Sequence, residues 1–139
     1  MMYEIVKEED PVKTMEFLEN RLYEHNANAL NKSDGDIFAW AVKNKKAETI
    51  AGIAGWTWAG ACEISQLWVD KTIREKGVGK ELLRQAEAAA KNRGCTVILI
   101  RTYAFQAPRF YEKAGYKTVF VQKDFPKGHD YYILTKELF

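Results

Sequence analysis

The chain has 139 residues, of which 47% are hydrophobic and 29% charged, the balance of one globular domain. Its formal net charge of +2 is too small to favour nucleic acid as a partner. No apolar run approaches the ~20 residues that cross a membrane, and the acidic N-terminal segment lacks the pattern of a signal peptide, so we expect a cytoplasmic protein.

The first half of the chain predicts a helix followed by an antiparallel meander. Tyr3 to Val6 has the composition of a short first strand. Asp10 before Pro11 is typical of an N-cap with proline at the first helical position, so we expect a helix from Pro11 to about His25. Three strands should follow, at residues 37–42, 49–58 and 62–69, with a charged loop at 43–48 and a turn at Ala59-Gly60.

The second half predicts a strand–helix–strand crossover. Val78 to Arg93 carries apolar residues at helical spacing, and Gly94 stands where a glycine ends a helix. Val97 to Ile100 is a continuous apolar run, as in a strand covered on both faces. Such a crossover makes residues 62–69 and 97–102 parallel neighbours. A short helix at 107–113 and strands at 117–123 and 131–138 would complete a single α/β domain, residues 1–139, with a mixed sheet of about six to seven strands.

Cysteine and histidine are sparse. Cys62 and Cys95 are the two cysteines of the sequence, and without a C-x-x-C spacing we expect both to be reduced, buried thiols. The two cysteines and two histidines lie too far apart to give a metal-ligand spacing, so we expect no metal.

The most informative stretch lies between the strand expected at residues 62–69 and the long helix. Residues 74–79 read REKGVG, with one residue between Gly77 and Gly79. Glycine lets the backbone approach a ligand closely because it has no Cβ, and the first N–H groups of the following helix are free. Together with the helix dipole, these groups favour an anion such as phosphate or pyrophosphate. Arg74, Lys76 and Lys80 add positive charge.

Two better-known phosphate loops do not match. A P-loop requires G-x-x-x-x-G-K-[ST], but Arg74 stands at its first glycine and Glu81 at its Ser/Thr position. A dinucleotide fingerprint requires a third glycine, where Leu82 stands. The remaining pattern is R-x-x-G-x-G between a strand and a helix. An isolated match of this kind is also compatible with a flexible helix entry that has a solvated basic rim.

The surrounding sequence resembles one family. The run from Glu63 to Gly79 (EISQLWVDKTIREKGVG) resembles the cofactor-binding segment of the GNAT N-acetyltransferases, and the run from Gln106 to Tyr116 (QAPRFYEKAGY) resembles the family's second signature block. The resemblance is strong over residues 63–116 and looser over the first 60 residues. It implies an acyl-CoA N-acyltransferase fold and an enzyme that moves the acetyl group of acetyl-CoA to a primary amine. Neither Cys62 nor Cys95 lies in a basic stretch that would lower the pKa of its thiol, so we expect direct transfer in a ternary complex.

The resemblance also implies how acetyl-CoA (coenzyme A) is held. In this family the strand before the phosphate loop splays from its parallel neighbour, and the pantetheine arm pairs with the freed backbone like an added strand. These groups would be those of Leu67 and Val69, whose side chains could equally be plain core residues. Gln106 would face the pantetheine or a water, where many members carry Asn. The full set expected at the cofactor is Leu67, Val69, Arg74, Lys76, Gly77, Val78, Gly79, Lys80 and Gln106.

Two residues are candidates for proton transfer. The attacking ammonium (pKa ~10.4 for lysine) must lose a proton, and the leaving thiolate needs a donor. Tyr111 matches the tyrosine of the family's F-Y-x-x-x-G-[FY] block and is the expected donor, with an aromatic core residue as the alternative. Glu63 matches the offset from Arg74 of the base in histone-acetylating members, with a solvated charge or an ion pair as the alternative. Strict strand alternation would put Glu63 on the same face as Leu67 and Val69, unless a bulge broke the parity.

The acceptor amine is left open by the sequence. The segments expected around it hold aromatic residues and carboxylates, including Trp56, Trp58, Phe125 and Asp130, which would suit a cationic amine. A small amine, a polyamine, an aminoglycoside-like drug and a protein lysine all fit, and His129 is a weaker candidate base. A non-catalytic acyl-CoA-binding module is the main alternative function, and a nucleotide-binding domain is disfavoured by the missing glycine and Ser/Thr. The apolar final strand could pair with a second copy in a homodimer.

Overall fold

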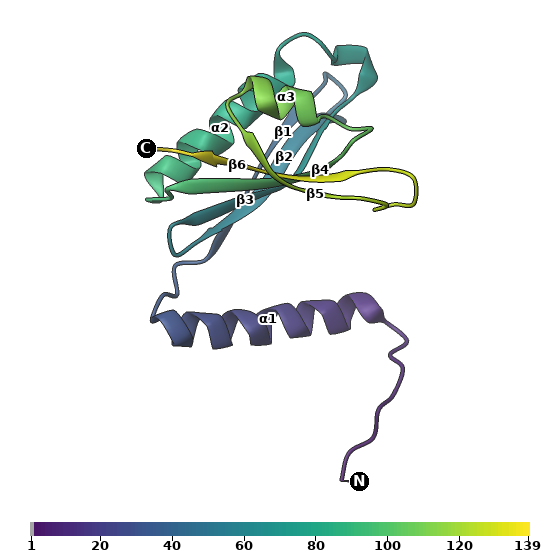
Figure 1. Cartoon of the computed structure of the whole chain (residues 1–139), viewed down its shortest axis with the longest axis vertical. Helices are drawn as coiled ribbons and strands as arrows, with labels where there is room; N and C mark the ends of the chain where they lie inside the picture. The colour runs from purple at the N-terminus through teal and green to yellow at the C-terminus, as the bar shows by residue number, and fades with distance from the viewer. Residues whose placement is uncertain (1) are drawn as a thin grey trace. The chain divides into compact units, whose positions relative to one another are not determined.

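The computed structural model describes residues 2–139, which divide into two compact units between Ser33 and Asp34 (Figure 1). The first unit holds one helix, α1 (Pro11–Leu30), and it begins as predicted, because the Asp10 carboxylate accepts a hydrogen bond from the Lys13 N–H at 3.3 Å. The helix runs past the predicted end at His25 and stops where Asn31 adopts the left-handed conformation, with φ 53°.

The predicted strand from Tyr3 to Val6 is wrong. Residues 2–10 form neither helix nor strand, and within residues 2–139 no strand pairs with this segment. A β-strand needs a neighbour for its backbone hydrogen bonds, so favourable composition alone does not form one.

The second unit is built on a six-stranded mixed sheet with the order β1-β2-β3-β4-β6-β5. Neighbouring strands are antiparallel except for the parallel pair β3–β4, so the predicted meander and crossover are both confirmed. Helix α2 connects the parallel strands, and β6 inserts between β4 and β5. The elements are β1 (Asp36–Lys43), β2 (Thr49–Trp58), β3 (Ala61–Val69), the 3₁₀ turn η1 (Lys71–Ile73), α2 (Val78–Asn92), β4 (Val97–Tyr103), α3 (Pro108–Lys113), β5 (Lys117–Gln122) and β6 (Tyr131–Glu137).

The core of this unit lies between α2, α3 and one face of the sheet (Figure 1). The buried side of α2, which includes Leu82, Leu83 and Ala86, packs against strand residues such as Ile98 and Leu134. Each fully buried leucine or isoleucine contributes about 1.5–3 kcal/mol through removal of apolar area from water. This packing fixes α2, and therefore its N-terminus, against β2 and β3. Among residues 2–139, no helix is long and apolar enough to cross a membrane.

Strand β3 contains a bulge. Ala54 of β2 pairs with Gln66, whereas the next residue, Gly55, pairs with Ile64, so Ser65 is an extra residue without a partner on β2. Gly55 accommodates the bulge, because a Cβ at this position would lie 3.1 Å from the Ile64 Cα and closer still to other atoms. The bulge changes which side chains share a face of the sheet.

The bulge overturns the parity that strict alternation predicts. Cys62 and Ile64 are buried beneath α2, and after the bulge Leu67 and Val69 pack against the same core. Glu63 alternates with Cys62 and Ile64, so its side chain leaves the sheet on the opposite face. The candidate base is therefore separated by the sheet from the side chains of Leu67 and Val69.

The parallel strands β3 and β4 pair only at their beginnings. The paired positions run from Ala61 with Val97 to Ile64 with Ile100. Beyond them, residues 65–69 of β3 have no partner on β4, while residues 101–103 of β4 continue to pair with β6. The expected splay is therefore present, and it opens where the bulge lies.

Candidate active site

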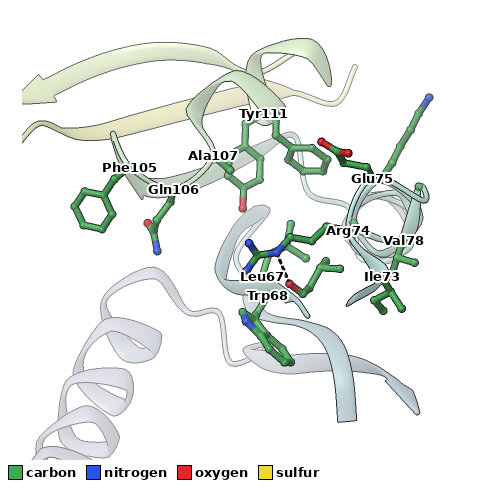
Figure 2. Close-up of a pocket in the computed structure, with 15 residues that line it drawn as sticks. Leu67, Trp68, Ile73, Arg74, Glu75, Val78, Phe105, Gln106, Ala107 and Tyr111 are labelled. Carbon is green, nitrogen blue, oxygen red and sulfur yellow. Dashed lines mark hydrogen bonds between the residues drawn. The ribbon is translucent and has the colours of Figure 1, made fainter. Parts of the chain in front are cut away.

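A pocket of about 540 Å³ lies at the splay, which is within the usual range for small-molecule sites (Figure 2). Strand β3 forms one wall, and the loop after β3, the start of α2 and α3 form the others. Its lining residues are Leu67–Val69, Ile73–Glu75, Gly77–Lys80, Phe105–Ala107, Phe110 and Tyr111. Most of the predicted cofactor residues thus meet around one cavity, whereas Lys76 is not among the lining residues.

The start of α2 supplies free backbone donors to this pocket. Its N-cap is Gly77, which has φ 81° and no side chain to accept a hydrogen bond from the helix. The first N–H with a partner inside the helix is that of Glu81, which bonds the Gly77 carbonyl at 3.1 Å. The N–H groups of Val78, Gly79 and Lys80 precede it, so they lack an intrahelical acceptor. An uncapped helix start beside a cavity fits the pyrophosphate of an acyl-CoA.

The loop before α2 is held by its own polar groups. The Asp70 carboxylate accepts hydrogen bonds from the backbone N–H of Thr72, at 2.9 Å, and from the Thr72 hydroxyl. These hydrogen bonds lower the pKa of Asp70. Glu75 has φ 64°, a left-handed conformation that costs a non-glycine residue about 1–2 kcal/mol. The β3–α2 loop thus has a fixed, locally strained shape beside the pocket.

Arg74 acts differently from a simple surface cation. Its side chain turns back into the pocket, where Nε donates to the Val69 carbonyl at 2.9 Å (Figure 2). The Asp70 N–H bonds the Ile50 carbonyl on β2, so the preceding backbone groups of Val69 point away from β2 and toward the splay. Both backbone groups of Val69 were expected to contact pantetheine. The carbonyl instead accepts a hydrogen bond from Arg74, whereas the N–H faces the splay.

Tyr111 is placed where a proton donor would be useful. Its side chain, only 6% exposed, extends from α3 with the hydroxyl directed into the pocket (Figure 2). The hydroxyl makes no hydrogen bond to any residue in the range 2–139. Burial raises the pKa of Tyr111 to about 12, so the phenol is protonated at neutral pH. A neutral, unpaired hydroxyl can donate a proton to a group bound in the pocket.

A second pocket, of about 300 Å³, continues from the first through the splay. Tyr111 and Gln106 line both pockets. The second pocket also reaches the buried Thr102 and Ile100 on the α2 side of β4 and the exposed Arg101, which alternates with them. The two pockets therefore form a passage from the α2 side of the sheet toward the opposite face.

Gln106 fixes the turn that follows β4. Its Oε1 accepts a hydrogen bond from the Tyr103 N–H at 2.8 Å and lies 3.2 Å from the Thr102 hydroxyl. These contacts hold the side chain at the junction of the two pockets, and the amide nitrogen remains available as a donor.

Glu63 stands apart from Tyr111, because it lies on the opposite face of the sheet and lines neither pocket. Its Oε1 is 3.5 Å from the Arg101 Nη2, so the ion pair that the sequence left as an alternative is present. The Glu63 side chain is 17% exposed and that of Arg101 is 50% exposed. Since Arg101 lines the second pocket, the ion pair places Glu63 next to that pocket without lining it.

The thiols have no place in this chemistry. Cys62 and Cys95 are both buried and free, as predicted. Burial raises the pKa of Cys62 to about 12 and also raises that of Cys95, so neither is a reactive thiolate at neutral pH. Within the described residues 2–139, no group of three or more His, Cys, Asp or Glu side chains could hold a metal ion.

The pocket also contains residues that the sequence did not single out. Trp68, Ile73, Glu75 and Phe105 line the larger cavity, and Arg101 lines the smaller one. Glu75 could have been named as a candidate pocket residue from the sequence, because it lies between Arg74 and Gly77 in the loop pattern. Trp68 and Ile73 lie within the run that resembles the family's cofactor-binding segment, whereas Phe105 and Arg101 carry no motif signal.

Comparison with known proteins agrees with this geometry. Two parallel strands that splay apart, next to a helix whose N-cap is a glycine, are the architecture of an acyl-CoA N-acyltransferase. The family model for the acetyltransferase (GNAT) family matches residues 1–116. Blasticidin-S acetyltransferase of Streptomyces morookaense is 34% identical over 107 residues, which cover 74% of this chain and 76% of the relative. The chain therefore belongs to the GNAT acetyltransferase family.

Solved structures show the same fold. The crystal structure of an acetyltransferase from Bacillus cereus has a TM-score of 0.79 and 31% identity, and the match covers 99% of both chains. An aminoglycoside 6'-N-acetyltransferase complexed with coenzyme A has a TM-score of 0.64 at 19% identity, covering 75% of this chain and 74% of the other, which shows likeness of fold.

Proposed function

We propose that this protein is an N-acetyltransferase that moves the acetyl group of acetyl-CoA to a primary amine by direct transfer in a ternary complex. The observation that carries the proposal is the meeting of two pockets at Tyr111, inside the β3–β4 splay. One pocket offers backbone donors for an acyl-CoA, and the other leads to the opposite face, from which an acceptor can approach. Two substrates can thus meet without a covalent enzyme intermediate.

The cofactor side uses backbone groups and cations. The N–H groups at the start of α2, with Arg74, Lys76 and Lys80 nearby, would hold the pyrophosphate, and the splayed backbone of Leu67 and Val69 would hold the pantetheine. Acetyl-CoA supplies the thioester as co-substrate, and no metal is required. Because these contacts are made mainly by main-chain atoms, they depend on the bulge and the splay.

The proton steps fall to two residues in this proposal. Tyr111, buried and protonated, would give a proton to the leaving thiolate. Glu63, which is ion-paired with the pocket residue Arg101, would take the proton of the acceptor ammonium. A water would have to link Glu63 to the amine, because the carboxylate lines neither pocket. His129 is the weaker candidate for this role.

The named activity of a relative supports a choice among the candidate acceptor amines. The relative from Streptomyces, which is 34% identical, is named for acetylation of blasticidin S. We therefore favour an amino group of a small molecule of the antibiotic type over a protein lysine. The two free, buried thiols fit a reducing, cytoplasmic location.

The test is amine-dependent release of CoA thiol. Wild-type protein, acetyl-CoA and a panel of primary amines should release thiol, and Tyr111→Phe should lower kcat about 100-fold or more with little change in the KM for acetyl-CoA. Tyr132→Phe is the matched control, because this partly buried tyrosine packs on the same core but lines neither pocket. Unchanged turnover in Tyr111→Phe would remove this residue from the mechanism.

A second variant tests the base, and the same assay tests the alternative function. Glu63→Gln should lower turnover and alter the dependence of rate on pH, whereas an identical pH profile would show that another group accepts the proton. Binding of acetyl-CoA without thiol release for any amine would favour the non-catalytic acyl-CoA-binding module.

A further inference from the structure

Five ring side chains gather where β4 ends and the β5–β6 hairpin turns. The rings of Tyr103 and Phe105 are stacked, with centroids 5.2 Å apart and planes 3° from parallel. Tyr131 lies 4.7 Å from Tyr103 and 4.9 Å from Phe125, and His129 meets Phe105 edge-on at 5.3 Å. These contacts join the five side chains into one continuous group, called here the ring cluster.

The ring cluster is open to a ligand at two points. Phe105 is 62% exposed and Phe125 is 50% exposed. Single exposed apolar residues are ordinary, but these two belong to one connected group beside the site. Phe105 lines the larger pocket together with Gln106 and Tyr111, and Figure 2 shows it beyond Gln106 on that side of the pocket. A ring bound against the cluster would thus lie near the reacting groups.

Backbone and polar contacts fix the cluster in place. The Ala104 N–H donates to the Asp130 carbonyl at 2.9 Å, which ties the turn after β4 to the hairpin. The Phe125 N–H donates to the His129 carbonyl at 2.9 Å, which closes the hairpin turn. A preformed surface of this kind binds with a smaller loss of conformational entropy than a mobile loop.

Two ion pairs lie next to the cluster. Glu63 pairs with Arg101, and Asp130 pairs with Lys123 at 3.0 Å. The solvent-facing ring surfaces of Phe105 and Phe125 are flat and apolar, and they therefore suit a flat apolar group.

We propose that the ring cluster is a subsite for an aromatic or heteroaromatic ring carried by the acceptor amine. This rests on the proposed function, because the amine attached to that ring would meet the acetyl group near Gln106 and Tyr111, which line both pockets. Phe105 and Phe125 are then specificity-determining residues. They stack against the acceptor ring and take no part in proton transfer.

The test compares two amines that differ only in aromaticity. 2-Phenylethylamine and 2-cyclohexylethylamine present the same chain length and similar bulk, so the ratio of their kcat/KM values reports recognition of a flat ring. We expect wild-type protein to prefer the aromatic amine by about 10-fold. Phe105→Leu and Phe125→Leu should each bring the ratio toward one. Phe120→Leu is the control, since Phe120 is 54% exposed on β5 and belongs to neither the cluster nor a pocket.

The outcomes separate this inference from the proposed function. Thiol release with a ratio near one in wild-type protein, or a ratio unchanged in both leucine variants, would overturn the subsite and leave the acetyltransferase intact. If no amine releases thiol, the proposed function fails, and the subsite is tested by saturation-transfer NMR with 2-phenylethylamine. Transfer to the ring protons that is lost in Phe125→Leu and kept in Phe120→Leu would support the subsite, and its absence in wild-type protein would overturn it.

Discussion

Replacement of Gly55 by alanine should damage both the fold and the site. An added Cβ would lie 2.2 Å from the Glu63 carbonyl oxygen, 2.6 Å from the Phe38 Cζ and 3.1 Å from the Ile64 Cα. Two of these atoms belong to the backbone of β3, so the strand itself has to move. Alanine gains up to about 1 kcal/mol through the backbone entropy of the unfolded chain. Overpacking costs roughly 1–3 kcal/mol, and a backbone clash belongs at or above the upper end.

The net expectation for Gly55→Ala is a loss of about 2 kcal/mol in the free energy of unfolding and a fall of roughly 6–8 °C in Tm. Urea unfolding and thermal melts followed by circular dichroism would measure both. Gly79→Ala is the control for stability, because its Cβ would meet its nearest neighbours at 3.5–3.7 Å, which is ordinary contact. A Gly55→Ala variant as stable as wild-type protein would refute the account of the bulge.

Three further predictions concern single residues. Tyr116→Phe removes a 2.8 Å hydrogen bond to the Glu87 carboxylate and should lower the free energy of unfolding by about 1.5–3 kcal/mol in urea titrations. Burial raises the pKa of Cys62 from 9.0 and that of Tyr111 from 10.0, each to about 12. The protonated Cys62 thiol and Tyr111 phenol therefore contribute fully to stability below pH 9, and this contribution is lost between pH 9 and 12. The same urea titrations should show the free energy of unfolding falling over that range, and a free energy that does not change with pH would contradict the prediction. Gln106→Glu keeps the side-chain oxygen that accepts the hydrogen bond from the Tyr103 N–H, whereas Gln106→Ala loses it. Steady-state kinetics should therefore show a several-fold rise in the KM for acetyl-CoA in the alanine variant alone.

Local sequence patterns predicted the elements that depend on local signals. A strand was expected at residues 49–58 and β2 is found there, because Lys43–Glu48 and Ala59-Gly60 mark both of its ends. Helix α2 begins at Val78 as predicted, and Gly94 has φ 78° just after its end. Glycine signals and helical periodicity are readable from a few neighbouring residues, which explains this agreement.

Features that depend on distant residues could not be predicted in this way. The extra residue at Ser65 leaves no mark in an alternating pattern, yet it decides that Glu63 and Leu67 lie on opposite faces. The Glu63–Arg101 ion pair requires knowledge of which strands are neighbours and where they separate. The ring cluster likewise joins the end of β4 to a hairpin about 20 residues further along the chain, and its members carry no motif.

The central claim is that the cavity at the β3–β4 splay binds acetyl-CoA, and calorimetric titration tests it most directly. Acetyl-CoA titrated into wild-type protein should bind at one site with a micromolar Kd, and ATP, as the control ligand, should bind far more weakly. The predicted contacts explain the difference, because the splayed backbone of β3 can pair with the pantetheine amides, which ATP lacks. Absence of acetyl-CoA binding, or tighter binding of ATP, would contradict the account and leave Gly77 and Gly79 as a helix entry.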